Sequence, residues 1–233
     1  MLLKTFIIDK KLKQFKKLNL QILTLICLKS FLLSCQSIDP YSNQMDYEKK
    51  LNGISVLKQE YAYSCNLTAL AIVKSSLGYS VNEESIRKYL SLEDRKRGML
   101  PHEFVIYGNK ALADTNYVLV QKNYNFRGEI LDQIISSLEL NLPIVMYYST
   151  INDWDRPNYD THYSVIYGIN YPRKIVIISN SYGYIQELAF DEFFDGLSYR
   201  NYKNEPLLHQ IARLVKIIRP NNLFFLTPKD SAK

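Results

Sequence analysis

Two runs rich in β-branched and aromatic residues, 162–170 (HYSVIYGIN) and 174–181 (KIVIISNS), follow each other closely in the chain. Runs of this composition favour strands, and so short a connection between them favours an antiparallel hairpin. In such a hairpin the beginning of the first strand lies beside the end of the second. The sequence therefore predicts that His162 and Asn180 are neighbours in the fold.

The segments around this hairpin predict helices first and strands afterwards. Apolar residues at helical spacing follow Cys65 and stop at Gly78, and further helices are expected after the capping residue Asn82 and after Pro101. Later segments predict a strand at 117–123, a helix at 129–141, a strand at 143–150 and a short helix at 190–198, whereas 211–220 is compatible with either a helix or a strand. This order is typical of an α+β domain in which a helical half packs on an antiparallel sheet.

The first 34 residues combine a lysine-rich start with an apolar run, which is the layout of an export signal. The run ends in LLSC, residues 32–35, which resembles the cleavage box of bacterial lipoproteins, and this resemblance implies a lipid on Cys35. Residues 35–50 are polar, as expected of a tether, and the domain would then span 51–233. We therefore expect an exported protein held on a membrane. An uncleaved anchor and an N-terminal helix that packs on the domain are the alternatives for the first 34 residues.

The net charge of +6 does not predict a nucleic-acid partner. Of 29 basic and 23 acidic residues, seven lysines and one aspartate lie in the first 34 residues, which leaves 22 of each sign in the rest of the chain. A neutral body offers no general attraction to a polyanion. The three histidines and three cysteines include no pair at the spacing of metal ligands, so neither a metal nor an organic cofactor is expected.

Four residues have the types and the order that thiol-dependent acyl transfer requires, namely Gln59, Cys65, His162 and Asn180. Cys65 would be the only thiol of the mature domain, and it stands where a helix begins. The helix dipole and the free backbone N–H groups there are expected to lower its pKa below the free value of about 8.5. His162 would act as general base and acid, Asn180 would orient its ring, and Gln59 would bind the oxyanion together with the backbone N–H of Cys65.

This order resembles that of the papain-like cysteine peptidases, in which Gln precedes Cys by six residues and a distant His is followed by Asn or Asp on the next strand. More narrowly, the segments QEYAYSCNLTALAIVKSSLGY, SSLELNLPIVMYY, HYSVIYGIN and IVIISNSYGY are similar to those of the bacterial double-glycine peptidases, which process bacteriocin leaders. The resemblance covers most of residues 51–200. It implies a papain-like fold, hydrolysis of a peptide bond and the four roles given above.

The sequence departs from that family at three points. Asn66 and Leu67 follow Cys65 where the family has Gly and then a small residue or Pro, and their bulk is expected to narrow the approach to the thiol. Asn180 stands where the family more often has Asp. No segment resembles the ABC exporter to which leader-processing members are commonly fused. The substrate is therefore less firmly implied than the reaction type.

Other residues have weaker assignments. Trp154 is expected to line the substrate cleft, with a buried loop anchor as an equal alternative, and Asn66 is expected to contact the substrate. Asp160 is the rival of Asn180, but it shares a strand face with His162 and cannot easily reach back to the ring. His102 and His209 are interpreted as structural residues.

Two other functions keep the same fold. One is a catalytically silent, papain-like binding module on the cell surface. The unusual CNLT segment suggests this function, and a free cysteine at a helix start is by itself more often a packing residue than a nucleophile. The other is a transglutaminase-like acyl transferase, in which an amine replaces water. In every case the expected partner is a peptide or a protein.

Overall fold

A computed structural model of the chain describes residues 46–92, 97–150, 161–200 and 207–231. The predicted export signal, Cys35, most of the predicted tether and the loop that contains Trp154 and Asp160 lie outside these residues. Every described residue belongs to one compact unit. In this part of the chain, no helix combines the length and the apolar content that a membrane span requires.

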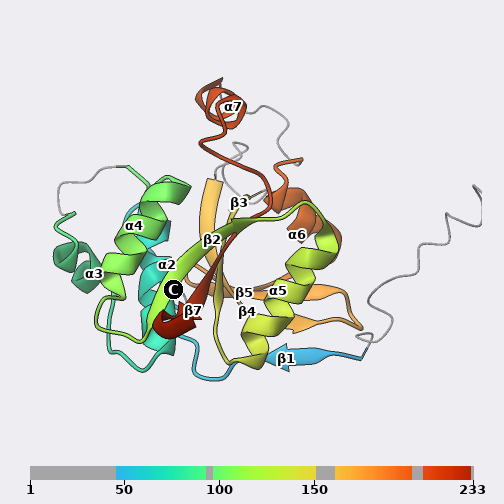
Figure 1. The fold of residues 1–233 in the computed structure, drawn as a ribbon, viewed down its shortest axis with the longest axis horizontal. Coiled ribbons are helices and arrows are strands. Elements are labelled where there is room, and N and C mark those ends of the chain that lie inside the picture. The colour runs from blue at the N-terminus through green and yellow to red at the C-terminus, as the bar shows by residue number, and fades with distance from the viewer. Residues whose placement is uncertain (1–45, 93–96, 151–160, 201–206, 232–233) are drawn as a thin grey trace, which may run out of the picture. The chain divides into compact units, whose positions relative to one another are not determined.

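An antiparallel sheet runs through the middle of the described structure (Figure 1). Its strand order is β2-β7-β3-β4-β5-β6, and β1 pairs with the end of β4. The strands are β1 (Glu48–Lys50), β2 (Tyr117–Asn123), β3 (Ile144–Ser149), β4 (Thr161–Asn170), β5 (Ile175–Asn180), β6 (Tyr184–Ala189) and β7 (Asn222–Pro228). Strands β3, β4 and β5 are buried almost throughout, which is expected of strands covered on both faces.

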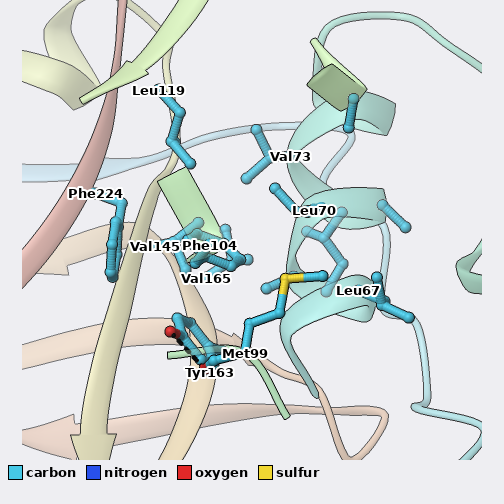
Figure 2. Close-up of a cluster of buried hydrophobic side chains, with 14 of the residues drawn as sticks. Leu67, Leu70, Val73, Met99, Phe104, Leu119, Val145, Tyr163, Val165 and Phe224 are labelled. Carbon is cyan, nitrogen blue, oxygen red and sulfur yellow. Dashed lines mark hydrogen bonds between the residues drawn. The ribbon is translucent and has the colours of Figure 1, made fainter. Parts of the chain in front are cut away.

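Three helices, α2 (Cys65–Ser76), α3 (Glu83–Tyr89) and α4 (Pro101–Ala111), lie together on one side of the sheet (Figure 1). Helix α2 is buried along most of its length, because α3, α4 and the sheet surround it. Figure 2 shows Leu70 and Val73 of α2 in one apolar cluster with Phe104 of α4 and with Val165 of β4. This packing presses α2, with Cys65 at its first position, against the strand that carries His162.

Two helices cover the other face of the sheet, α5 (Arg127–Glu139) and α6 (Phe190–Leu197). Side chains alternate along β3, so that Val145 belongs to the cluster around α2 whereas Ile144 packs with Ile130 and Phe193 of α5 and α6. Helix α7 (Leu207–Leu214) and the short 3-10 turn η2 (Lys229–Ser231) complete the described elements. The α+β architecture predicted from the sequence, helices packed on an antiparallel sheet, is thus confirmed.

The structure also corrects details of the prediction. Strands β6 and β7 were not predicted, and β7 lies between β2 and β3 inside the sheet. Residues 211–220 form the second half of α7 and a loop rather than a strand. Glu48–Lys50, the last residues of the predicted tether, pair with Gly168–Asn170, so the sheet begins before the predicted domain boundary at Leu51.

A buried ion pair ties α3 to the loop before α2. The side chain of Asn82 caps α3 as predicted, and the next residue, Glu83, is 3% exposed and lies 2.5 Å from the guanidinium of Arg87. The same carboxylate accepts hydrogen bonds from the hydroxyl of Thr68 and from the backbone N–H of Glu60, both at 2.8 Å. One acidic side chain therefore fixes the loop and the first turn of α2 in relation to α3.

Glu83→Gln is expected to lower the free energy of unfolding by about 3 kcal/mol, because it leaves the buried charge of Arg87 uncompensated. Urea unfolding of the full chain measures this difference. The matched control is Glu84→Gln, since Glu84 forms an exposed pair with Lys88 on the same helix and its removal should change stability little. Equal losses for both variants would contradict the role assigned to Glu83.

Candidate active site

His162 and Asn180 lie side by side, as the predicted hairpin requires. The pairing of β4 with β5 places Ser164 opposite Asn180, and the Nε2 atom of His162 is 3.0 Å from the Oδ1 atom of Asn180. An amide oxygen only accepts hydrogen bonds, so Nε2 carries the ring proton. The other ring nitrogen, Nδ1, is therefore the one that can accept a proton.

The orientation of the Asn180 amide is set by its neighbours. Its Oδ1 atom also accepts the backbone N–H of Tyr182 at 3.0 Å, and a backbone N–H can only donate. Its Nδ2 atom donates to Gln186 at 2.9 Å and to the hydroxyl of Tyr184 at 3.3 Å. These contacts keep the amide oxygen directed at the His162 ring.

Cys65 stands where α2 meets β4. The hydroxyl of the preceding residue, Ser64, hydrogen-bonds to the backbone of Tyr61 and does not cap the helix. The first backbone N–H groups of a helix have no partner within it. The thiol is close to the backbone of Tyr163, the residue after His162. A hydrogen bond from this backbone favours the thiolate and so lowers the pKa of Cys65. Among the described residues no hydrogen bond joins the thiol to the imidazole, whose contact is to Asn180.

The thiol of Cys65 does not have the low pKa expected from its place at a helix start. Cys65 is only 8% exposed, and burial raises its pKa to about 11, although backbone hydrogen bonds from Tyr163, Asn66 and Cys65 itself oppose the rise. The expectation of a lowered pKa is therefore wrong for this structure. That expectation considered only the helix N-terminus, which lowers the pKa of the thiol. Burial also removes water from the thiolate, and this loss of hydration raises the pKa by more than the backbone N–H groups lower it.

His162 is buried as well, with 2% of its surface exposed. The ring of Tyr182 stacks on it at 4.3 Å between centroids, and the ring of Tyr148 lies at 6.0 Å in an edge contact. Burial lowers the pKa of His162 to about 4, against the hydrogen bond to Asn180, which favours the charged ring. At neutral pH the site therefore holds a thiol and an uncharged imidazole.

Ser181 connects the three segments of the site. Its hydroxyl lies 2.7 Å from the carbonyl oxygen of Tyr163 and 3.2 Å from that of Cys65, and its own carbonyl accepts the N–H of Gln59 at 2.7 Å. Ser181 is fully buried. Strand β4, the start of α2 and the loop that carries Gln59 therefore meet at this one residue.

The backbone of Gln59 is at the site, but its side chain serves its own loop. The Nε2 atom of Gln59 donates to the carbonyl of Tyr61 at 2.8 Å, and its buried Oε1 atom has no hydrogen-bond partner among the described residues. Gly183, at φ +93°, allows the loop to come this close, because a Cβ there would lie 2.7 Å from the Cβ of Lys58. One of the two Nε2 protons of Gln59 is thus used within the loop.

Asn66 and Leu67 point away from open solvent. Leu67 is 3% exposed and packs in the cluster around α2 (Figure 2). Asn66 is 2% exposed and donates to the carbonyl of Tyr63 at 3.3 Å. The burial of these two side chains gives no support to a narrowed approach to the thiol by Leu67, nor to the predicted contact of Asn66 with substrate.

The remaining predicted residues lie elsewhere. Cys35, Trp154 and Asp160 are outside the described residues. His102 is exposed on α4, and the ring of His209 meets that of Tyr199 at 5.1 Å. No group of three or more His, Cys, Asp or Glu side chains within the described ranges is arranged to hold a metal ion.

Sequence reasoning missed the residues that support the site. Ser181, Tyr182 and Gln186 act through contacts with Cys65, His162 and Asn180, and their types alone did not indicate this. The position of Ser181 and Tyr182 directly after Asn180 was the available signal, although a turn explains such residues equally well.

A protein-family model matches most of the chain. Residues 40–207 match the family model described as "Peptidase_C39 like family". No curated protein matches the chain in sequence.

Solved structures resemble the chain at low sequence identity. A C39-like peptidase from Bacillus anthracis has a TM-score of 0.51 and 13% identity, over 79% of this chain and 99% of that one. The peptidase domain of Streptococcus ComA, a bifunctional ABC transporter involved in quorum sensing, has a TM-score of 0.46 and 13% identity, over 78% and 99%. A double glycine motif protease from an AMS/PCAT transporter, in complex with the leader peptide, has a TM-score of 0.45 and 13% identity, over 78% and 99%. The Bacillus anthracis structure shows a shared fold.

The rate of Cys65 alkylation by iodoacetamide is expected to be low at pH 5 to 8 and to rise toward pH 11, because burial holds the proton on the thiol. Mass spectrometry of digested full chain separates Cys65 from Cys27 and Cys35. His162→Ala should leave this pH profile nearly unchanged, since the imidazole is uncharged above its pKa of about 4. Fast alkylation of Cys65 at pH 5 that His162→Ala abolishes would instead reveal a thiolate and imidazolium pair.

Proposed function

The chain belongs to the Peptidase C39-like family and has an α+β papain-like fold, and from this premise we propose that it hydrolyses peptide bonds with Cys65, His162, Asn180 and Gln59. Family membership supports a cysteine peptidase-like function, and the proposal adds the residues that carry it. Its main support is the 3.0 Å contact of His162 Nε2 with Asn180 Oδ1, on the strand that packs against the start of α2.

In the proposed reaction, the sulfur of Cys65 attacks the carbonyl carbon of the substrate while Nδ1 of His162 takes the thiol proton. The two pKa values, about 11 for the thiol and about 4 for the imidazole, disfavour a separate proton transfer before attack. The proton is therefore expected to move as the C–S bond forms. His162 then gives this proton to the leaving amine, and water, with the same base, releases the acid product from the thioester.

Asn180 and the backbone around Cys65 would stabilise the charges that develop. The 3.0 Å hydrogen bond to Asn180 keeps Nε2 protonated and Nδ1 available, and it favours the imidazolium once that forms. The backbone N–H of Cys65 lies at a helix N-terminus, where negative charge is favoured. The second amide proton of Gln59 would join it at the oxyanion.

A catalytically silent binding module is the second candidate, because one observation favours it. Cys65 and His162 are both buried and uncharged, and no hydrogen bond joins them. A peptidase must admit a peptide to this thiol, whereas a binding module need not.

The activity is tested by incubating the full chain with a diverse peptide pool and detecting new peptide termini by mass spectrometry. Cleavage is expected for the wild type, with a loss of about a thousandfold in Cys65→Ala and a comparable loss in His162→Ala. The matched control is His102→Ala, since His102 is exposed on α4 and should not affect the rate.

Other outcomes of this experiment would favour one of the two alternative functions. No new termini from the wild type, with peptide binding retained by Cys65→Ala, would favour the binding module. Incorporation of an added amine in place of hydrolysis would indicate the transglutaminase-like acyl transferase.

We also propose that the protein is exported and anchored on a membrane surface by lipid on Cys35. The support is the lysine-rich and apolar segment at 1–34, which ends at LLSC. Mass spectrometry of the protein purified from membranes should find Cys35 as the lipid-bearing N-terminal residue, and Cys35→Ser should keep the complete N-terminus. A mature wild-type chain that still begins at Met1 would contradict this proposal.

A further inference from the structure

Helix α7 turns its apolar side chains away from the protein. Leu207, Leu208 and Leu214 are 71%, 81% and 82% exposed, and no residue of α7 is buried. With Ile211 they follow the spacing of a single helical face, and Val215 continues it just after the helix. So large a cluster of exposed apolar side chains marks a surface that contacts something apolar.

Two polar residues of α7, His209 and Arg213, lie against Tyr199, whereas Gln210 is exposed. The ring of His209 contacts the ring of Tyr199 at 5.1 Å, and the guanidinium of Arg213 lies over the same ring at 5.6 Å. Ala212 packs against the cluster around α2. The helix is therefore amphipathic with its apolar face outward, which is the reverse of a surface helix in a water-soluble domain.

The charged side chains of α7 and of the described residues that follow it, up to 228, are all positive. Residues 207–228 contain Arg213, Lys216 and Arg219 and no Asp or Glu. These three side chains, together with Tyr124 and Gln210, help to line a hollow of about 840 Å³ beside the helix. A hollow of this composition suits an anionic group such as a phosphate.

From these observations we propose that the face formed by Leu207, Leu208, Ile211 and Leu214 of α7 docks on a membrane surface of anionic phospholipids. The apolar side chains enter the boundary between headgroups and acyl chains, and the lipid phosphates lie at the exposed side chains of Lys216 and Arg219. This surface lies outside the residues proposed for peptide hydrolysis, and it does not depend on that activity.

Charge distinguishes a lipid surface from other occupants. In a symmetric dimer through this face, each copy would bring its Lys216 and Arg219 toward those of the other copy, and like charges repel. Anionic headgroups complement both features of the face, since one surface offers acyl chains and phosphates together. Figure 1 shows α7 standing apart from the helices on both faces of the sheet.

Aromatic rings connect α7 to the surroundings of Cys65. The ring of Tyr199, which contacts α7, meets the ring of Tyr147 at 6.2 Å. Tyr147 is in turn so close to Cys65 that a thiolate at Cys65 raises the pKa of Tyr147. Docking through α7 would thus hold Cys65 near the membrane.

The experiment places a tryptophan on the face and looks for contact with acyl chains. The full chain with Leu208→Trp is mixed with vesicles of phosphatidylcholine brominated on its acyl chains, with and without phosphatidylglycerol. Leu140→Trp is the matched control, because Leu140 is also a highly exposed leucine, at the end of α5. The native Trp154 is present in both proteins and gives the same background.

With phosphatidylglycerol, the fluorescence of Leu208→Trp is expected to shift to the blue and to lose intensity, whereas Leu140→Trp should not respond. Adding Lys216→Gln and Arg219→Gln to Leu208→Trp should reduce the loss, and vesicles of phosphatidylcholine alone should give a smaller one. Far-UV circular dichroism checks that each variant is folded.

Three results would overturn the proposal. Equal quenching of both tryptophan variants would mean that the N-terminus alone brings the chain to the bilayer. A shift of Leu208→Trp that depends on protein concentration without vesicles would identify a second copy as the occupant, and a shift on adding a peptide substrate would identify a peptide.

Discussion

The arrangement of Cys65, His162 and Gln59 depends on the contacts of one fully buried residue, Ser181. Its hydroxyl makes the central contacts. It lies between the carbonyls of Tyr163 and Cys65, and the carbonyl of Ser181 accepts the N–H of Gln59. Hydrogen bonds with no competing water hold their partners closely, because leaving them unmade would cost the desolvation of each group. Cys65, His162 and the loop of Gln59 come from distant parts of the chain, and this residue brings their backbones together. The apolar cluster around α2 then presses the helix into that junction.

The same burial that fixes the geometry opposes ionisation. A thiolate and an imidazolium both lose hydration in this interior, so the pKa of Cys65 rises and that of His162 falls. A preformed ion pair is thus disfavoured in the described structure, and reaction would require proton transfer during attack. Burial holds the uncharged side chains of Cys65 and His162 in place, but the same burial opposes the access of a peptide to the thiol.

The outward apolar face of α7 is the opposite case, in which leucine side chains stay in water while the half-buried side chains of His209 and Arg213 lie against Tyr199. Burying Leu208 or Leu214 against the domain would stabilise the fold, and each side chain of this size contributes about 2 kcal/mol when fully buried. A helix that forgoes this gain retains a surface for another apolar phase. Its link to Tyr147 through Tyr199 joins that surface to the cluster beside Cys65.

The sequence by itself determined the features that depend on local pattern. Strand composition and a short connection gave the hairpin that brings His162 to Asn180, and the cap at Asn82 and the helix from Cys65 follow from neighbouring residues. Only the tertiary structure decided the raised pKa of Cys65, the inner position of β7 and the outward face of α7. The physical reason is that hydration, strand order and the partner of a helix face depend on contacts between residues far apart in the chain, and periodicity carries no information about them.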